Sequence, residues 1–245
     1  MTAADVVSIA SKDLAVIRHR RSIMTALVLF PLLVGLGLPL VLVFAGRDAG
    51  GVPADVLPQL LTSFQFFFVI GAATLPTAIA AYSFVGEKVE RSLEPLLATP
   101  VSDVDVLLGK ALAAVAPSVA SMWIGVTVFM TVADIEAHAK LRYWFFPNPT
   151  AVIAMLLLVP LVAMVSAEVC VLVSARSNDV RSAQQVATLI VIPFAALYVA
   201  SEIGAITLDP GSMLALAAVM LVLVVALFFA ARAAFNREEI LTRWK

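Results

Sequence analysis

The chain has 245 residues, of which 62% are hydrophobic and 13% are charged, with a formal net charge of −1 at pH 7. A soluble domain of this length usually carries about twice that charged fraction, so the composition excludes a soluble globular protein and indicates an integral membrane protein. The single cysteine, Cys170, excludes an internal disulfide and a cysteine-built metal site, and the two histidines, His19 and His138, are too far apart in sequence to suggest a metal pair. No metal site and no nucleic-acid partner are expected.

The N-terminal stretch Asp5–Arg21 has the spacing of an amphipathic helix. Its charged residues, including Lys12 and Asp13, fall mostly outside an apolar stripe. The stripe consists of Val6, Ala10, Leu14 and Ile17. Because a membrane span follows directly, we expect residues 1–21 to lie in the plane of the membrane interface.

The apolar run Ser22–Ala45 follows a cluster of arginines, as in a signal peptide, but its length of about 23 residues exceeds the apolar core of such a peptide. We therefore expect an uncleaved first span. A loop rich in Gly, Pro and Asp, Gly46–Pro58, leads to a second span at about Leu60–Val85.

The longest charged interval of the chain is Gly86–Lys110, here called the charged segment. It must lie at or outside the lipid headgroups, because the hydrocarbon cannot satisfy its charges. Pro95 and Pro100 each interrupt helical structure. Ser102 and Asp105 have the spacing of a capping box, which predicts a new helix running into the next span.

Between the two prolines lie Leu96 and Leu97, two adjacent apolar residues on a polar loop. Side chains of this kind need a surface that buries them. Two alternatives remain open from the residues alone. The leucines fold back against this protein, or they dock into another one.

The charged segment resembles the cytoplasmic coupling segment of ABC-2 type permease subunits, which are the transmembrane subunits of ABC exporters. The resemblance covers about a tenth of the chain. Many members have Gly before the Ser/Thr of the motif, where this chain has Arg91. The matching positions are Glu87, Glu90, Ser92, Leu93, Glu94, Leu96, Leu97, Ala98, Thr99, Pro100, Gly109 and Lys110.

Four more spans are predicted after the charged segment. They are expected at about Lys110–Ala133, Thr150–Ser174, Ala183–Ser201 and Ser212–Phe235. Their connections are Asp134–Pro149, Ala175–Ser182 and Glu202–Gly211. Prolines within the spans predict local kinks; they are Pro31, Pro39, Pro76, Pro117, Pro160 and Pro193.

Placing the N-terminus inside puts 13 of the 16 Lys and Arg residues on the cytoplasmic side, and leaves Arg47, Lys140 and Arg142 outside. This asymmetry orients the protein. The sequence therefore predicts an all-α membrane protein of six transmembrane helices, preceded by an N-terminal amphipathic interfacial helix. Both termini are expected in the cytoplasm, with residues 1–245 forming one permease domain.

Glu168 is the only acidic residue deep within a predicted span, roughly 9 Å from its inner end. Such a carboxylate is a functional candidate by default. The structural alternative is that it packs against a polar neighbour near the inner face: Arg176, Arg181, Gln184 or Gln185. No phosphate-binding loop and no recognisable catalytic constellation occurs in the sequence, so no catalytic residue is predicted.

The resemblance implies an ATP-driven exporter in the plasma membrane of a prokaryote. Two permease subunits, identical or paired with a homologue, would assemble with two separate ATPase subunits. Mg-ATP would bind to the ATPase, and this chain would hold no cofactor. The implied ATPase-coupling residues are Glu87, Glu90, Glu94, Leu96, Leu97, Thr99 and Pro100. The alternative function is an ion- or proton-coupled secondary transporter that uses Glu168.

Overall fold

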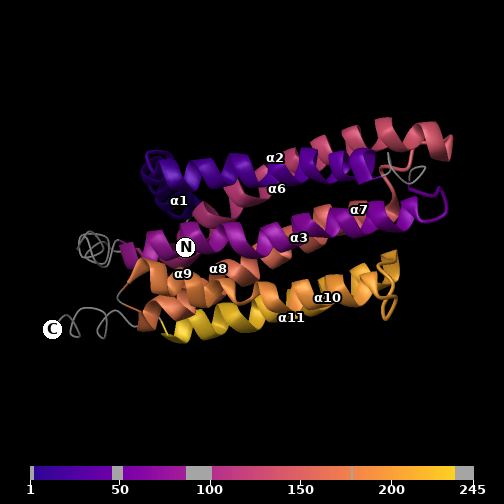
Figure 1. Ribbon diagram of the computed structural model, residues 1–245. Coiled ribbons are helices and arrows are strands. Elements are labelled where there is room, and N and C mark those ends of the chain that lie inside the picture. Colours follow the sequence, from indigo (N-terminus) through magenta and orange to yellow (C-terminus); the bar gives the residue numbers. More distant parts are fainter. Residues whose placement is uncertain (1–2, 46–51, 87–100, 178, 235–245) are drawn as a thin grey trace.

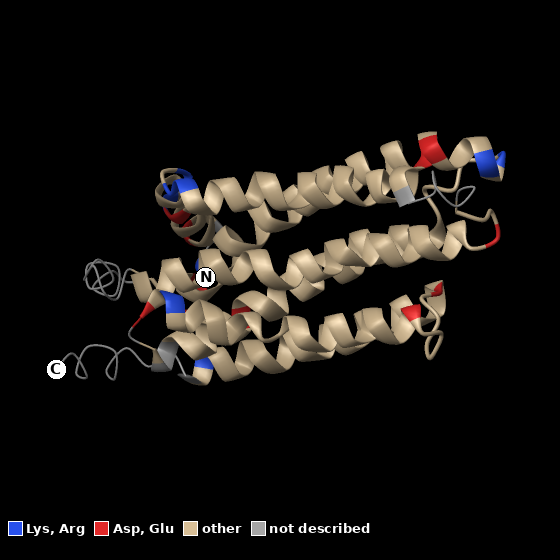
Figure 2. Cartoon of the chain, in the orientation of Figure 1, with Lys and Arg blue, Asp and Glu red and all other residues tan. Residues whose placement is uncertain are grey.

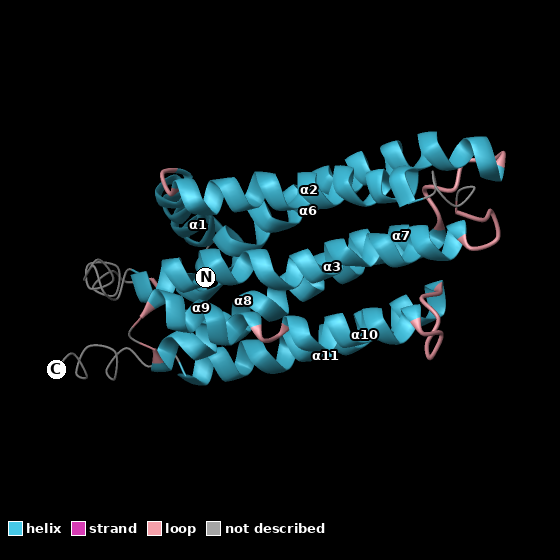
Figure 3. Cartoon of the chain, viewed as in Figure 1, coloured by secondary structure: helices cyan, strands magenta, loops and turns pink. Residues whose placement is uncertain are grey.

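The computed structural model describes residues 3–45, 52–86, 101–177 and 179–234, and these ranges contain helices but no strand (Figures 1 and 3). The all-α prediction is confirmed for this part of the chain. The elements are α1 (Ala3–Arg18), α2 (Arg21–Ala45), α3 (Leu57–Ala81), η1 (Tyr82–Gly86), α6 (Asp103–Leu141), α7 (Pro149–Ile153), η2 (Ala154–Leu158), α8 (Val159–Arg176), α9 (Val180–Thr188), α10 (Val191–Glu202) and α11 (Pro210–Ala234). The two η elements are π-helical turns.

Six helical stretches of the described chain are long and apolar enough to cross a membrane, as predicted. They are Arg21–Phe44, Leu57–Gly86, Asp103–Leu141, Pro149–Ser174, Val180–Glu202 and Pro210–Ala233.

Helices α3 and α8 pack against each other at the centre of the bundle. Figure 1 shows α2 and α6 along one side of α3, and α10 and α11 along the other. Leu61 and Phe68 of α3 are completely buried, whereas Leu33 of α2 and Val222 of α11 are 61% and 68% exposed. Apolar side chains that point outward are stable in this protein because lipid surrounds the bundle.

Helices α2 and α6 approach closely where small residues face each other. A Cβ atom added to Gly125 of α6 would lie 2.4 Å from Pro31 Cβ and 2.8 Å from the Pro31 carbonyl oxygen of α2. The hydroxyl of Ser121 donates a hydrogen bond to the Leu27 carbonyl at the same crossing. Small residues that let backbones touch are typical of helix pairs in membranes.

The third span is longer than predicted. Helix α6 continues past Ala133 to Leu141, so the expected loop Asp134–Pro149 starts about two turns too early. The run after Ala133 is polar but contains good helix formers, and it ends where Arg142 adopts a left-handed conformation with φ 62°. The Asp134 carboxylate is buried and accepts hydrogen bonds from the backbone N–H groups of the two residues before Pro147, Phe145 and Phe146.

The fifth span is broken. Helices α9 and α10 are separated at Leu189 and Ile190, where Ile190 N–H donates to the Ala187 carbonyl in a tight turn. Pro193 has no N–H for the Leu189 carbonyl, and its ring clashes with that carbonyl in a regular helix. The predicted kink at Pro193 is therefore a break.

The fourth span contains the π-helical turn η2 just before Pro160. Pro160 cannot donate to the Leu156 carbonyl, and a wider turn accommodates the missing bond. The spans that contain the other prolines continue through them. Those prolines are Pro31 and Pro39 in α2, Pro76 in α3 and Pro117 in α6.

Most described basic residues gather at one end of the bundle (Figure 2). That end holds Lys12, Arg18, Arg20, Arg21, Lys110, Arg176, Arg181 and Arg232. The opposite end holds Lys140 and Arg142. The basic end also carries α1 and the two described flanks of the charged segment (Figure 1).

Candidate functional site

The predicted ATPase-coupling residues lie in residues 87–100, outside the described residues, and their roles stay predictions. This applies to Glu87, Glu90, Glu94, Leu96, Leu97, Thr99 and Pro100. The structure describes the two ends of the charged segment, which are Gly86, the last residue of η1, and residues 101–110. We refer to η1 and residues 101–110 as its flanks.

The second flank starts a new helix where the capping box predicted one. The Asp105 N–H donates to Ser102 Oγ at 3.2 Å, and the Ser102 hydroxyl in turn donates to the Asp105 carboxylate. Ser102 has the extended backbone of an N-cap residue. Asp103 and Asp105 place negative charge in the first turn of α6, where the helix dipole favours it.

Lys110, one and a half turns further along α6, has a completely buried side chain. Its ammonium group donates to Asp13 Oδ2 at 3.1 Å, to the Ser83 carbonyl at 2.8 Å and to Ser83 Oγ at 3.2 Å. An ammonium has three protons, and these three acceptors can take them all. The centroid of the Phe84 ring lies 5.4 Å from Lys110 Nζ, within the distance of a cation–π contact.

Asp13 of α1 is 3% exposed and is the anionic centre of this cluster. Its Oδ2 accepts from Lys110 and also from the Ser83 hydroxyl. Its Oδ1 lies 3.4 Å from the ammonium of Lys12. A buried ion pair of this kind depends on both partners, because removing one leaves an uncompensated charge in a medium of low dielectric.

The sequence predicted that the charged residues of α1, including Asp13, lie mostly outside its buried face, and for Asp13 this prediction is wrong. The face of α1 that is buried consists of Ile9, Ala10, Asp13 and Ile17, and α1 packs against α6. Leu14, assigned to the apolar stripe, is 37% exposed. The pairing of Asp13 with Lys110 makes a carboxylate compatible with the buried face. That α1 also lies in the membrane interface stays a prediction.

Gly109 allows α1 to pack closely against α6. A Cβ atom at Gly109 would lie 2.8 Å from Ile9 Cβ and 3.0 Å from the Val6 carbonyl oxygen. Atoms do not approach so closely without a shift of the backbone. The Gly109-Lys110 pair thus has two physical roles, since the glycine admits α1 and the lysine binds its carboxylate.

Further contacts hold neighbouring elements against the flanks of the charged segment at the basic end. The guanidinium carbon of Arg20 lies 4.1 Å from the ring centroid of Tyr82 in η1. A separate apolar cluster draws one or two buried residues from each of α1, η1, α6, α8 and α11. Its members are Ile9, Phe84, Val106, Leu107, Val171 and Ala231.

Glu168 lies in α8 and is 4% exposed, as expected for a residue deep in a span. Its Oε2 atom has no hydrogen-bond partner among the described residues. Of the expected partners, Arg181, Gln184 and Gln185 make no bond to Oε2, and the Arg176 side chain lies outside the described part of the chain. The role of Glu168 stays a prediction.

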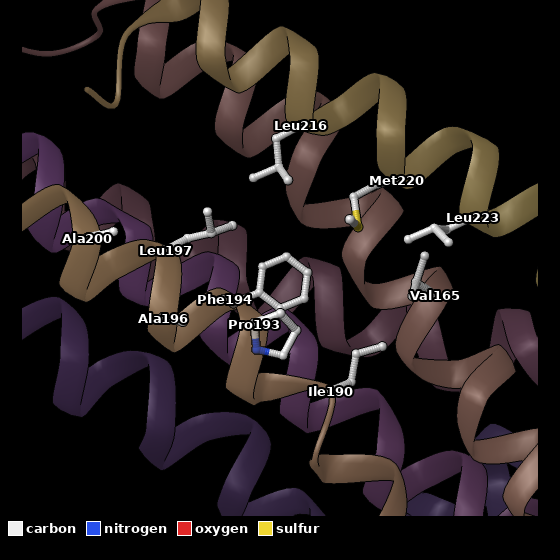
Figure 4. Close-up of a pocket in the computed structure, with 10 residues that line it drawn as sticks. All are labelled: Val165, Ile190, Pro193, Phe194, Ala196, Leu197, Ala200, Leu216, Met220 and Leu223. Carbon is white, nitrogen blue, oxygen red and sulfur yellow. The ribbon is translucent and has the colours of Figure 1, made fainter. Parts of the chain in front are cut away.

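An apolar groove of about 590 Å³ lies between α8, α10 and α11 (Figure 4). Val165 of α8, Phe194 of α10 and Met220 of α11 are among the side chains that line it. The ten lining residues are all apolar, so the groove offers no charge and no metal ligand. No group of three or more possible metal-ligating side chains occurs elsewhere in the described ranges.

A family model described as ABC-2 family transporter protein matches residues 7–211. The matched region includes Asp13, Ser83 and Lys110 together with the whole charged segment. A search of curated proteins found no match. Because the family model covers most of the chain, and six helices can span the membrane, the chain belongs to the ABC-2 family of transporter proteins.

Proposed function

We propose that this protein is the membrane subunit of an ATP-driven ABC-2 type exporter. It forms the substrate pathway and is driven by a separately encoded ATPase that binds the charged segment. The observation that carries the proposal is the family match over residues 7–211, which contains this segment. The sequence has no phosphate-binding loop of its own, so Mg-ATP would bind to the ATPase.

The basic end of the bundle is the cytoplasmic end in this proposal. Short connections rich in Lys and Arg remain inside during membrane insertion. This orientation supports placing the charged segment, α1 and both termini in the cytoplasm of a prokaryotic cell, with the spans in its plasma membrane.

The complete exporter would contain two permease subunits and two ATPase subunits. The second permease subunit is another copy of this chain or a homologue. When ATP brings the ATPase subunits together, each pulls on a charged segment. The segment connects α3 and α6, so its displacement acts directly on two helices that pack against each other in the bundle.

The proposal is tested by replacing Leu96 and Leu97 together with Asp. Burying two unpaired carboxylates in an interface should abolish co-purification of the separately encoded P-loop ATPase that the proposal requires. Membrane insertion should not change, because the segment does not enter lipid. The matched control replaces Ile240 and Leu241 with Asp. These residues are another adjacent apolar pair in an expected cytoplasmic segment, and this variant should retain the ATPase. Retention of the ATPase by both double variants would contradict the proposed coupling surface.

One observation favours a second candidate function. Glu168 is a buried carboxylate whose Oε2 has no partner among the described residues, which suits a site that carries a proton or a cation. A secondary transporter of this kind would work without nucleotide.

A further inference from the structure

We propose that α1 takes part in coupling the ATPase to the helices of the permease. Asp13, acting through Lys110 and Ser83, positions both ends of the charged segment, so that α1, α3 and α6 respond to the ATPase as one body. This inference rests on the proposed function, since it assumes that the ATPase binds the charged segment.

The two ends of the charged segment meet at one carboxylate. Ser83 lies three residues before Gly86, and Lys110 is the last residue of the segment. Both bond to Asp13 Oδ2, and they also bond to each other through Lys110 Nζ and the Ser83 carbonyl at 2.8 Å. Asp13, a side chain from a third element, therefore adds its carboxylate to a direct contact between the start and the end of the segment.

The burial of these groups makes the link persistent. Lys110 and Asp13 are 0% and 3% exposed, and Ser83 is 4% exposed. An exposed ion pair opens readily because water solvates both charges. A buried pair that separates leaves each charge without solvent and without a partner, so the closed arrangement is strongly favoured.

Independent contacts hold α1 against the same two flanks. Ile9 packs onto Gly109 at the end of the segment, and it belongs to the same apolar cluster as Phe84 of η1. Arg20, between α1 and α2, stacks over Tyr82 of η1. A force applied to residues 87–100 therefore reaches α1 by polar and apolar routes.

Asp13 is a positioning residue in this scheme, because it acts on the ATPase contact only through Lys110 and Ser83. In purified permease–ATPase complexes, Asp13→Asn should leave the ATPase bound, since Leu96 and Leu97 are unchanged. It should lower the permease-dependent part of ATP turnover about tenfold, which is within the range of coupling between sites. Asp5→Asn, which removes a carboxylate two turns earlier in α1, is the matched control and should behave as the unmodified chain.

A double variant separates positioning from folding. Asp13→Leu with Lys110→Met replaces the ion pair by apolar side chains of similar size, which restores folding stability in other buried ion pairs. It removes every bond to Ser83. We expect the thermal unfolding midpoint to recover and the permease-dependent ATP turnover to stay low. Recovery of both would overturn the inference, because Asp13 would then serve folding alone.

A covalent link tests the movement as one body, with the reduced form of the same double-cysteine variant as the control for the two substitutions. In a Cys170→Ser background, Ile9→Cys and Gly109→Cys place two Cβ atoms close together, and an opening of about 1 Å gives the separation of a disulfide. If α1 moves with α6, the oxidised and reduced complexes should turn over ATP equally. Inhibition by oxidation that is reversed by reduction would show that α1 must separate from α6, and the inference would be wrong. Failure of the unmodified chain to bind the ATPase would instead contradict the proposed function.

Discussion

The Lys110 ammonium lies 3.1 Å from Asp13 Oδ2, although 97 positions separate the two residues in the sequence. One residue belongs to the N-terminal helix and the other closes the charged segment. Their contact explains why α1 packs on α6 with a carboxylate in its buried face. Loss of either partner would leave the other charge buried at the basic end.

Two lysines contact the Asp13 carboxylate, and replacing each of them should lower the free energy of unfolding by very different amounts. Lys110→Ala leaves Asp13 buried without its main partner, and a loss of about 3–5 kcal/mol is expected. Lys12 is 44% exposed and lies 3.4 Å from Asp13 Oδ1, so Lys12→Ala should cost less than about 1 kcal/mol. Thermal unfolding of the detergent-purified protein measures both. Equal midpoints for the two variants would contradict the burial of the pair.

The crossing of α2 and α6 should tolerate no side chain at Gly125. Gly125→Ala places a Cβ atom 2.4 Å from Pro31 Cβ, and overpacking of this kind costs about 1–3 kcal/mol. Gly37 in α2 is the matched control, because a Cβ atom there meets nothing within 4 Å. Gly37→Ala should leave the unfolding midpoint unchanged or slightly higher, since Ala favours helix over Gly. The opposite order of the two midpoints would refute this crossing geometry.

Membrane orientation can be tested with two exposed positions at opposite ends of the bundle, Ser102 and Thr207. In a Cys170→Ser background, Thr207→Cys should react with an impermeant thiol reagent added to intact cells. Ser102→Cys should react only after permeabilisation. The reverse pattern would place the charged segment outside the cell and eliminate coupling to a cytoplasmic ATPase.

Substitutions at Glu168 separate the two candidate functions. If the transporter is driven by ATP, Glu168→Gln should change ATP turnover little. Glu168→Leu should be tolerated or stabilising, because Oε2 of the native side chain is buried without a partner. Vesicles that contain the permease and its ATPase, given an ion gradient but no nucleotide, should build up no pH change attributable to the protein. A gradient-driven proton movement that Glu168→Gln abolishes would establish the secondary transporter instead.

The six spans could be predicted because long apolar runs alternate with charged stretches, and each run is near the length that a bilayer requires. The start of α6 could also be predicted, since Ser102 and Asp105 are near neighbours whose spacing specifies a cap. In both cases the residues that form the pattern are also the residues whose interactions produce the structure.

The cluster around Asp13 could not be predicted in the same way. A lone Asp on a short amphipathic helix is normally solvated, and only the tertiary fold brings Lys110 and Ser83 to it. The resemblance to a family motif included Gly109 and Lys110, but it gave no physical reason for either residue. The extension of α6 was missed because polarity was taken as the end of the helix. It marks only the end of the apolar part.

The length of α6 has a mechanical consequence. Its 39 residues form one helix of about 58 Å, nearly twice the thickness of the hydrocarbon layer. Lys110 is held near one end, and Asp134, about 36 Å further along the axis, binds the backbone of the opposite loop. A small tilt at one end of such a helix produces a larger sideways displacement at the other end. A tilt of about 5° at Lys110 would carry Asp134 sideways by about 3 Å, which is enough to break or remake its hydrogen bonds on the far side of the membrane.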